Sequence, residues 1–201
     1  MGSVTTSHPP VRMPDVEAGA PPLPTRERIP QVALALFVRK GYDATSMREI
    51  AEQLGITKAA LYYHFDSKEG IVEALLAEMF ARVDELVEWV REQPRDADLP
   101  REILRRWCDI MQLSGLDLFR FAVTNRATLQ ELKRGRTLHR RVAELQDALT
   151  CDGASTEAKL RARMALGAVN MAGMAALDLD VPDEEILAAA RAVAFDLLPT
   201  S

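Results

Sequence analysis

Apolar residues recur along most of the chain at the three- and four-residue spacing of an α-helix. The first group, within residues 26–40, consists of Ile29, Ala33, Leu36 and Phe37. Thr25 is a natural N-cap for this helix, and Gly41 directly after it is typical of a helix end. Pro30 leaves two possibilities, because a proline beyond the first turn removes a backbone hydrogen bond. Either the helix bends, or it begins late with Pro30 in its first turn.

Two short helices joined by a glycine turn are predicted next. Thr45 or Ser46 can cap the first of them, and its apolar side consists of Met47, Ile50, Ala51 and Leu54. Gly55 breaks this helix, Ile56 returns to the core, and Thr57 can cap the second. The second helix turns Ala60, Leu61 and Phe65 inward, and on its other faces lie Lys58, Ala59, Tyr62, Tyr63 and His64. Two such helices, braced by the preceding one, form the helix-turn-helix arrangement.

A long helix follows this motif. Ser67 can cap it, and an apolar stripe continues along one side until Pro94. Its length suits a connection between two halves of the protein. The segment "PRDADLP" then reads as a linker, after which Pro100 opens a helix that ends near Gly115.

The rest of the chain is also predicted to be helical. Between residues 116 and 150 the pattern is helical, with Gly135 as the expected interruption. Ser155 or Thr156 caps a helix to about residue 178, and the last helix begins at Pro182. No run alternates polar and apolar residues with period two. We therefore predict an all-α protein of about nine helices.

The segment 164–177 is almost wholly apolar, which raises the question of a membrane helix. Its fourteen residues are too few to span a bilayer, and Asn170 lies in the middle. A helix that is apolar on several sides is buried, and four small residues let a neighbouring backbone approach: Gly167, Ala168, Ala172 and Gly173. We therefore predict an oligomer interface, formed with the final helix.

Charge is distributed unevenly over the chain. The formal net charge of −5 argues against a nucleic-acid partner, because phosphate binding depends on Lys and Arg. Residues 25–70, however, carry seven basic and six acidic side chains, whereas residues 71–201 carry seventeen and twenty-two. Only the first of these segments is suited to face DNA.

Cysteine content and the N-terminal segment point to the cytoplasm. The two cysteines, Cys108 and Cys151, lie far apart and have no histidine or second thiol at metal-ligand spacing. We therefore expect no disulfide framework, no metal site and no cofactor. Residues 1–24 contain six prolines and no apolar run, so they are predicted to be a disordered arm rather than a secretory signal.

The stretch "LYYHF", residues 61–65, carries the strongest functional signal. Leu61 and Phe65 are four apart and belong to the core, but Tyr62, Tyr63 and His64 cannot all share that face. Hydroxyl and imidazole donors beside lysines can hold DNA phosphates while the helix enters the major groove. The pattern therefore favours DNA binding by this helix.

Residues 25–76 also resemble a known family. The ordered set "GY-ATS-REIAE-LGI", "LYYHF" and "SKE" strongly resembles the DNA-binding domain of the tetracycline-repressor (TetR) family of bacterial transcription regulators. The resemblance covers about a quarter of the chain, and Pro30 departs from the usual first helix. It implies a helix-turn-helix domain over 25–70, with the motif at 46–65, and a helical regulatory and dimerisation domain over 71–201.

The resemblance also implies contacts with DNA, residue by residue. The expected base contacts are Arg48, Lys58, Ala59 and Tyr63. Arg48 and Lys58 are the best candidates for guanine, whose O6 and N7 accept their donors, and Ala59 for a thymine methyl. The expected phosphate contacts are Thr45, Ser46, Thr57, Tyr62, His64 and Lys68, the last aided by the N-terminus of the long helix.

For the rest of the chain, the resemblance implies a homodimer on a palindromic operator, joined through the helices at 156–178 and 183–198. Half-sites would lie roughly 34 to 36 Å apart, one DNA turn. A small-molecule effector is implied among the helices of residues 100–178, acting through the long helix. Residues there that are suited to line a pocket are Trp107, Met111, Phe119, Phe121, Asn125, His139, Asn170, Met171 and Met174. Core packing for the apolar residues, and a surface or hydrogen-bonded position for the histidine and asparagines, are the stronger interpretations, so no ligand-binding residue is assigned.

Three other functions compete with a repressor released by an effector. An activator would use the same contacts with DNA. An architectural DNA-binding protein without an effector would be basic throughout, and residues 71–201 are acidic. An enzyme would need a convergent catalytic set, and His8, His64 and His139 form none with other residues. A cytoplasmic, ligand-responsive repressor is therefore the function predicted from the sequence.

Overall fold

The computed structural model describes residues 24–131, 133–150 and 153–198. All regular structure within these ranges is helical, so the all-α prediction is confirmed. The predicted disordered arm lies almost entirely outside the described residues, as does Cys151. The helices are α1 (Thr25–Lys40), α2 (Met47–Leu54), α3 (Lys58–His64), α4 (Lys68–Glu92), α5 (Leu99–Ser114), α6 (Leu116–Thr124), α7 (Arg126–Glu131), α8 (Lys133–Ala148), α9 (Thr156–Ala175) and α10 (Asp183–Leu197).

The start of α2, its end and the start of α3 lie at the residues predicted from the sequence. The Ser46 hydroxyl accepts the Glu49 N–H at 3.2 Å, and the Glu49 carboxylate accepts the Ser46 N–H at 2.9 Å. This reciprocal capping box fixes the first turn of α2. Gly55 ends the helix in the left-handed region at φ 69°, where a side chain would be strained. The Thr57 hydroxyl then accepts the Ala60 N–H at 3.1 Å and starts α3.

Three details of the helix boundaries differ from the sequence-based predictions. Thr25 is the first residue of α1 and not its cap, since Pro24 holds that position without a side-chain hydrogen bond. Pro30 lies inside α1 and is buried, so of the two alternatives the late start is excluded. Gly135 lies within α8 and does not interrupt it, whereas α6 ends at Asn125. Glycine lowers helix propensity by only about 1 kcal/mol, which the neighbouring residues can offset.

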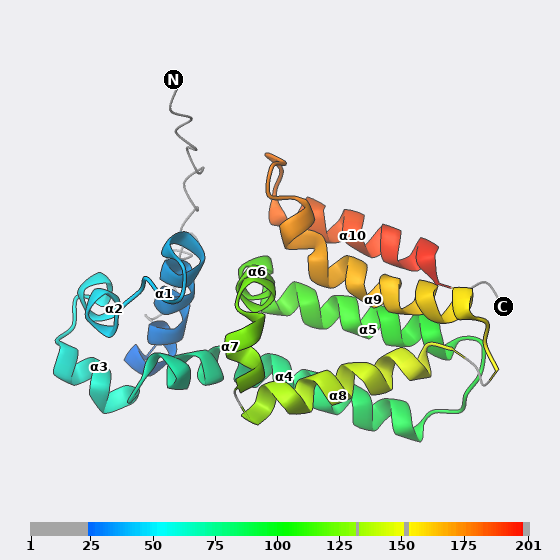
Figure 1. Ribbon diagram of the computed structural model, residues 1–201, viewed down its shortest axis with the longest axis horizontal. Coiled ribbons are helices and arrows are strands. Elements are labelled where there is room, and N and C mark those ends of the chain that lie inside the picture. Colours follow the sequence, from blue (N-terminus) through cyan, green and yellow to red (C-terminus); the bar gives the residue numbers. More distant parts are fainter. Residues whose placement is uncertain (1–23, 132, 151–152, 199–201) are drawn as a thin grey trace.

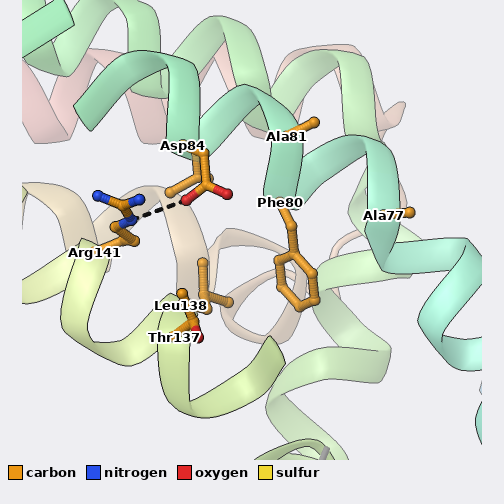
Figure 2. A pocket seen from close by; sticks show the side chains of 8 residues that line it. Ala77, Phe80, Ala81, Asp84, Thr137, Leu138 and Arg141 are labelled. Carbon is orange, nitrogen blue, oxygen red and sulfur yellow. Dashed lines mark ion pairs between the residues drawn. The ribbon is translucent and has the colours of Figure 1, made fainter. Parts of the chain in front are cut away.

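The helices form a small N-terminal body and a larger bundle, and α4 runs from one into the other (Figure 1). In the bundle, α4 packs against α5 and α8, while α9 and α10 lie together along one side. Arg141 of α8 reaches Asp84 of α4, with 2.9 Å between its Nε and the Asp84 Oδ1 (Figure 2). No helix of the described residues combines the length and the apolar character that crossing a membrane requires.

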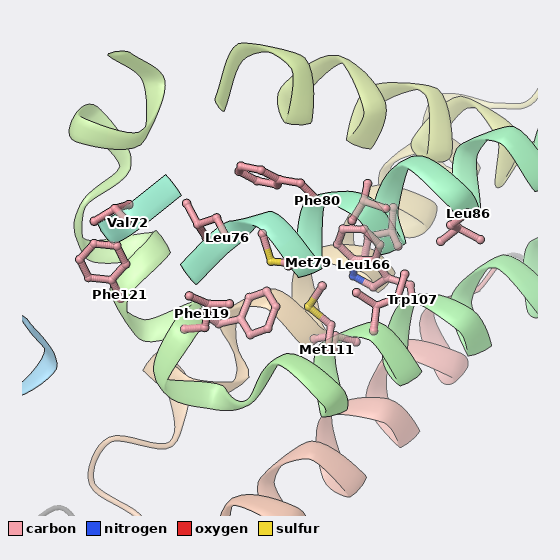
Figure 3. Packing of buried hydrophobic residues seen from close by; sticks show 14 of the residues in the cluster. Val72, Leu76, Met79, Phe80, Leu86, Trp107, Met111, Phe119, Phe121 and Leu166 are labelled. Carbon is pink, nitrogen blue, oxygen red and sulfur yellow. The ribbon is translucent and has the colours of Figure 1, made fainter. Parts of the chain in front are cut away.

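The inner faces of α4, α5, α6 and α9 enclose one apolar core (Figure 3). Among its members are Leu76, Met79, Trp107, Met111, Phe119 and Leu166. The Trp107 Nε1 donates to the Asn170 Oδ1 at 3.2 Å, so the indole is both buried and hydrogen-bonded. Trp107, Met111, Phe119 and Phe121 therefore pack in the core, which was the alternative to their lining a pocket.

Helix α6 joins the N-terminal body to the bundle. Phe121 is 1% exposed, and its ring centroid lies 5.5 Å from that of Phe37 in α1 and 6.1 Å from that of Tyr42. The preceding residue, Arg120, donates from Nε to the Gly173 carbonyl of α9 at 3.2 Å and pairs with Asp183 of α10 at 3.3 Å. Successive residues of α6 thus bind α1 on one side and the α9 and α10 pair on the other.

Truncation of Phe121 should destabilise the whole protein. We expect Phe121→Ala to lower the free energy of unfolding by about 3 to 5 kcal/mol, because it leaves a cavity between α1 and α6. The control is Leu113→Ala, which removes an aliphatic side chain that is 65% exposed and should change stability by less than about 0.5 kcal/mol. Urea denaturation at one protein concentration measures both, and equal losses would contradict the assignment.

The capping carboxylate should make the N-terminal body sensitive to acid. The ammonium of Lys40, 2.6 Å away, and the hydrogen bonds from Ser46 lower the pKa of Glu49 from 4.5 to about 2. Because the folded pKa is the lower one, the stabilisation is fully present above about pH 4.5 and is lost as pH falls through about 2. The difference in free energy of unfolding between wild type and Glu49→Gln should shrink across that window in urea titrations. A constant difference would contradict this account.

Candidate DNA-binding surface

Helix α3 has one buried side and one exposed side. Leu61 is 0% exposed and Phe65 is buried, so they anchor the helix to the core of the N-terminal body. Lys58, Ala59, Tyr62 and Tyr63 are exposed, and Tyr63 is 86% exposed. A tyrosine ring held almost entirely in water has no packing function in this chain. The predicted division between core and outward residues of α3 is thus confirmed for Leu61, Phe65, Tyr62 and Tyr63.

Contacts among the outward residues set the shape of this surface. The Lys58 ammonium lies 5.5 Å from the centroid of the Tyr62 ring, a cation–π contact one helical turn long. The Tyr63 ring meets the His64 ring edge to face, with centroids 5.3 Å apart. The four polar side chains of α3 therefore form two contacting pairs, Lys58 with Tyr62 and Tyr63 with His64.

Arg48 stands beside α3 on the preceding helix. Its side chain is 79% exposed, and its Nε donates to the Glu52 Oε1 at 2.7 Å. The hydrogen bond and the charge of Glu52 raise the pKa of Arg48, which stays cationic. The guanidinium has five N–H donors in all, so the fork that matches guanine is left available by this single hydrogen bond.

Two of the predicted phosphate contacts, Ser46 and Thr57, lie at the N-termini of α2 and α3. Both hydroxyls act as caps, and the backbone N–H groups of these first turns lie beside them. Thr45 differs from these two residues. It is 1% exposed, and its hydroxyl donates to the Gly41 carbonyl at 2.8 Å, so it closes the turn after α1 instead.

Lys68, another predicted phosphate contact, is also bound to other residues of the protein. Its ammonium donates to the Tyr42 carbonyl at 2.8 Å and lies 4.4 Å from the centroid of the Tyr42 ring. The Tyr42 hydroxyl donates to Glu69 at 2.9 Å, and burial together with this bond raises the pKa of Tyr42. The pKa of Glu69 is lowered, chiefly by the backbone N–H at the start of α4 and then by Tyr42. Lys68 therefore positions α4 as well as facing outward.

Sequence reasoning missed the part that Tyr42 and Lys40 play in this surface. Tyr42 connects α1, α4 and α6, and Lys40 ties the end of α1 to Glu49 in the capping box of α2. Both contacts join residues that are nine or more positions apart, which helical periodicity does not reveal. The signal present in the sequence is the "GY" pair inside the family-like stretch, from which local rules predict only a helix end.

The described residues hold no group of three His, Cys, Asp or Glu side chains that is arranged to bind a metal ion. Cys108 is buried, and burial raises the pKa of its thiol to about 11, so it stays protonated.

Comparison with known proteins agrees with this geometry. A family model described as bacterial regulatory proteins, tetR family, matches residues 29–75. An uncharacterized HTH-type transcriptional regulator of Bacillus subtilis, YvkB, is 46% identical over 55 residues, which are 27% of this chain and 29% of that protein. The HTH-type negative transcriptional regulator IcaR of the Staphylococcus aureus icaADBC biofilm operon is 50% identical over 48 residues, 24% of this chain and 26% of that one. The chain thus matches less than a third of the length of these curated relatives.

Solved structures extend the likeness of fold to the rest of the chain. Mycobacterium smegmatis AmtR has a TM-score of 0.64 and 24% sequence identity, with 91% of this chain and 90% of that chain covered. The TetR family transcriptional regulator PfmR of Thermus thermophilus has a TM-score of 0.56 and 27% identity, over 89% of this chain and 97% of its own. Residues 29–75 thus match the tetR family of bacterial regulatory proteins, and the fold of the described residues is similar to that of PfmR.

Proposed function

We propose that this protein is a transcriptional regulator that binds a specific DNA operator through the exposed face of α3. The observation that carries the proposal is Tyr63, which is 86% exposed on a short helix whose other side is anchored in the core. Lys58 and Ala59 lie beside it and are exposed as well. A helix fixed in this way can enter the major groove as a rigid body, with its outer residues against base edges.

The residues around α3 divide by the part of DNA that they would contact. Lys58, Ala59, Tyr63 and, from α2, Arg48 are the base contacts of the proposal. The phosphate contacts are Ser46, Thr57, Tyr62, His64 and Lys68, which carry hydroxyl, imidazole or ammonium donors. Because the phosphate contacts act on every sequence and the base contacts do not, the two groups predict different consequences of mutation.

The proposal includes a homodimer formed through α9 and α10. Leu160, Met164 and Met171 are 56%, 50% and 46% exposed, and their spacing places them on one face of α9. Val193 of α10 is 52% exposed. Exposed apolar side chains that share one face favour an interface, because burying them against a second copy removes them from water. The half-buried Gly167 lies on the same face of α9 and lets a partner helix come close.

We further propose that the protein acts as a repressor in the cytoplasm and is released from DNA by a small molecule. The relative IcaR is named as a negative transcriptional regulator, which favours repression over activation. An architectural DNA-binding protein would be basic throughout, whereas residues 71–201 carry seventeen basic and twenty-two acidic side chains. A ligand that binds better to the geometry that does not bind DNA would lower DNA affinity by the same factor as DNA lowers ligand affinity.

Selection of bound sites from a random duplex pool tests DNA recognition. Wild type should enrich a palindromic sequence with half-sites roughly one DNA turn apart. Failure to enrich any sequence would overturn the proposed function.

Single substitutions should then separate the two kinds of DNA contact. Lys58→Ala should relax the preference at one base pair, at a cost in binding free energy of about 1 to 3 kcal/mol. Lys68→Ala should weaken binding to all sequences and reduce the slope of log affinity against log salt concentration by about one. Arg101→Ala in α5 removes an exposed positive charge far from α3 and serves as the control. Fluorescence anisotropy at several salt concentrations measures each variant, and identical effects of Lys58→Ala and Lys68→Ala would refute the division into base and phosphate contacts.

A charge on the apolar face of α9 should break the dimer. We expect Met164→Asp to give monomers in sedimentation velocity, because an unpaired carboxylate would be buried between two apolar surfaces. Leu113→Asp introduces the same charge at a side chain of α5 that is 65% exposed and should leave the dimer intact. A wild-type protein that sediments as a monomer, or a Met164→Asp variant that stays dimeric, would contradict the proposed interface.

A further inference from the structure

A hollow of about 270 Å³ lies between α4 and α8. Two residues of α4 with small side chains, Ala77 and Ala81, line it. Phe80 and Leu138 form its apolar walls (Figure 2). None of the pocket-lining residues expected from the sequence takes part in it. Its outer end is polar, with Asp84, Thr137 and Arg141.

Arg141 is the unusual side chain of this hollow. It is 15% exposed, and its Nε is buried without an aligned hydrogen bond among the described residues, although the Asp84 Oδ1 lies 2.9 Å away. Its Nη1 donates to Glu88 at 3.3 Å, a long contact for a charged pair. A guanidinium carries five donors, and a buried one is stabilised only when they are matched. This cation therefore has donor capacity left over, beside an apolar space.

The two charged groups at the hollow, Arg141 and Asp84, differ in their exposure to solvent. Asp84 is 49% exposed and can leave Arg141 for water, whereas Arg141 stays buried between the helices. An incoming anion would therefore replace Asp84 at the guanidinium, and Asp84 would be solvated. An incoming cation would instead have to displace the buried group of the pair. The difference in exposure favours an anion as the ligand.

The volume limits the size of that anion. A cavity of about 150 Å³ holds benzene, and drug-sized ligands occupy pockets of about 300 to 1,000 Å³. The hollow lies between these values and is lined mainly by carbon. A carboxylate matches the planar fork of a guanidinium with two parallel hydrogen bonds.

We propose that the hollow between α4 and α8 binds a small monocarboxylic acid, with the carboxylate on Arg141 and the hydrocarbon body against Phe80 and Leu138. As regulation, the inference rests on the proposed function, because the acid would then be the effector. Helix α4, which forms one wall of the hollow, begins at Lys68 in the N-terminal body. A ligand wedged between α4 and α8 would shift α4 and, through it, the recognition helix α3.

Calorimetric titration of the full chain with hexanoate tests the site without any DNA. We expect hexanoate to bind with a millimolar or tighter Kd, and hexanamide and hexylamine to bind at least about tenfold more weakly, since each loses the charge-assisted hydrogen bonds. Equal binding of hexanamide, a preference for hexylamine, or no binding of hexanoate would overturn the proposal.

Four variants locate the ligand. Arg141→Gln should weaken hexanoate binding about tenfold or more, and Ala77→Leu should abolish it by filling the hollow. Asp84→Asn should strengthen binding, because it removes the competing carboxylate, whereas a site for cations predicts the opposite. Arg82→Gln removes an arginine that pairs with Glu78 on the same helix, outside the hollow, and should leave the Kd within about twofold. Unchanged binding in Arg141→Gln with an intact fold would refute the assignment.

A second titration separates this site from the proposed function. If wild type selects an operator and hexanoate lowers its affinity for that duplex, both proposals stand. If no duplex is selected while hexanoate binds with the expected variant pattern, the proposed function fails and the carboxylate site stands. If an operator is selected but hexanoate does not bind, the carboxylate site fails and the DNA-binding function stands.

Discussion

The contact of Phe121 with Phe37 and Tyr42 fixes the position of α1, and through it that of α3, relative to the bundle. Helix α3 packs mainly on α2, α2 packs on α1, and α1 packs on α4 and α6. The position of the exposed residues of α3 is therefore set through α1. Three aromatic rings with centroids 5.1 to 6.1 Å apart make this contact both apolar and geometrically specific.

A polar network at the start of α4 adds to this contact. Lys68 and Glu69 both bind Tyr42, one through its carbonyl and ring and the other through its hydroxyl. The same tyrosine thus fixes α4 and packs on Phe121 of α6. On the far side of α6, Arg120 lies against Gly173 of α9, where an added Cβ would stand only 3.0 Å from the Arg120 Cγ. The bundle and the DNA-facing body are therefore held by two adjacent residues of α6.

Local rules were sufficient to predict the N-terminal body. Ser46, Gly55 and Thr57 act on neighbours within five residues, so their capping and turn roles can be inferred from the sequence alone. The outward direction of Tyr63 follows from its helical spacing relative to Leu61 and Phe65, and the family resemblance then suggested its function. Burial is harder to predict from local rules than capping. Thr45 is polar and adjacent to a cap, but it is 1% exposed and its hydroxyl donates to the carbonyl of Gly41.

The residues that line the hollow between α4 and α8 were also not predicted from the sequence. Large apolar residues such as Trp107 and Phe119 are natural candidates for a pocket, yet they are the residues best able to fill one, and they form the core. The hollow arises where side chains are small, at Ala77 and Ala81, and where a cation from a distant helix is buried. Neither feature stands out in a sequence. Helix α4 begins in the N-terminal body and also forms one wall of the hollow, so the proposed ligand would contact the element that joins the two bodies.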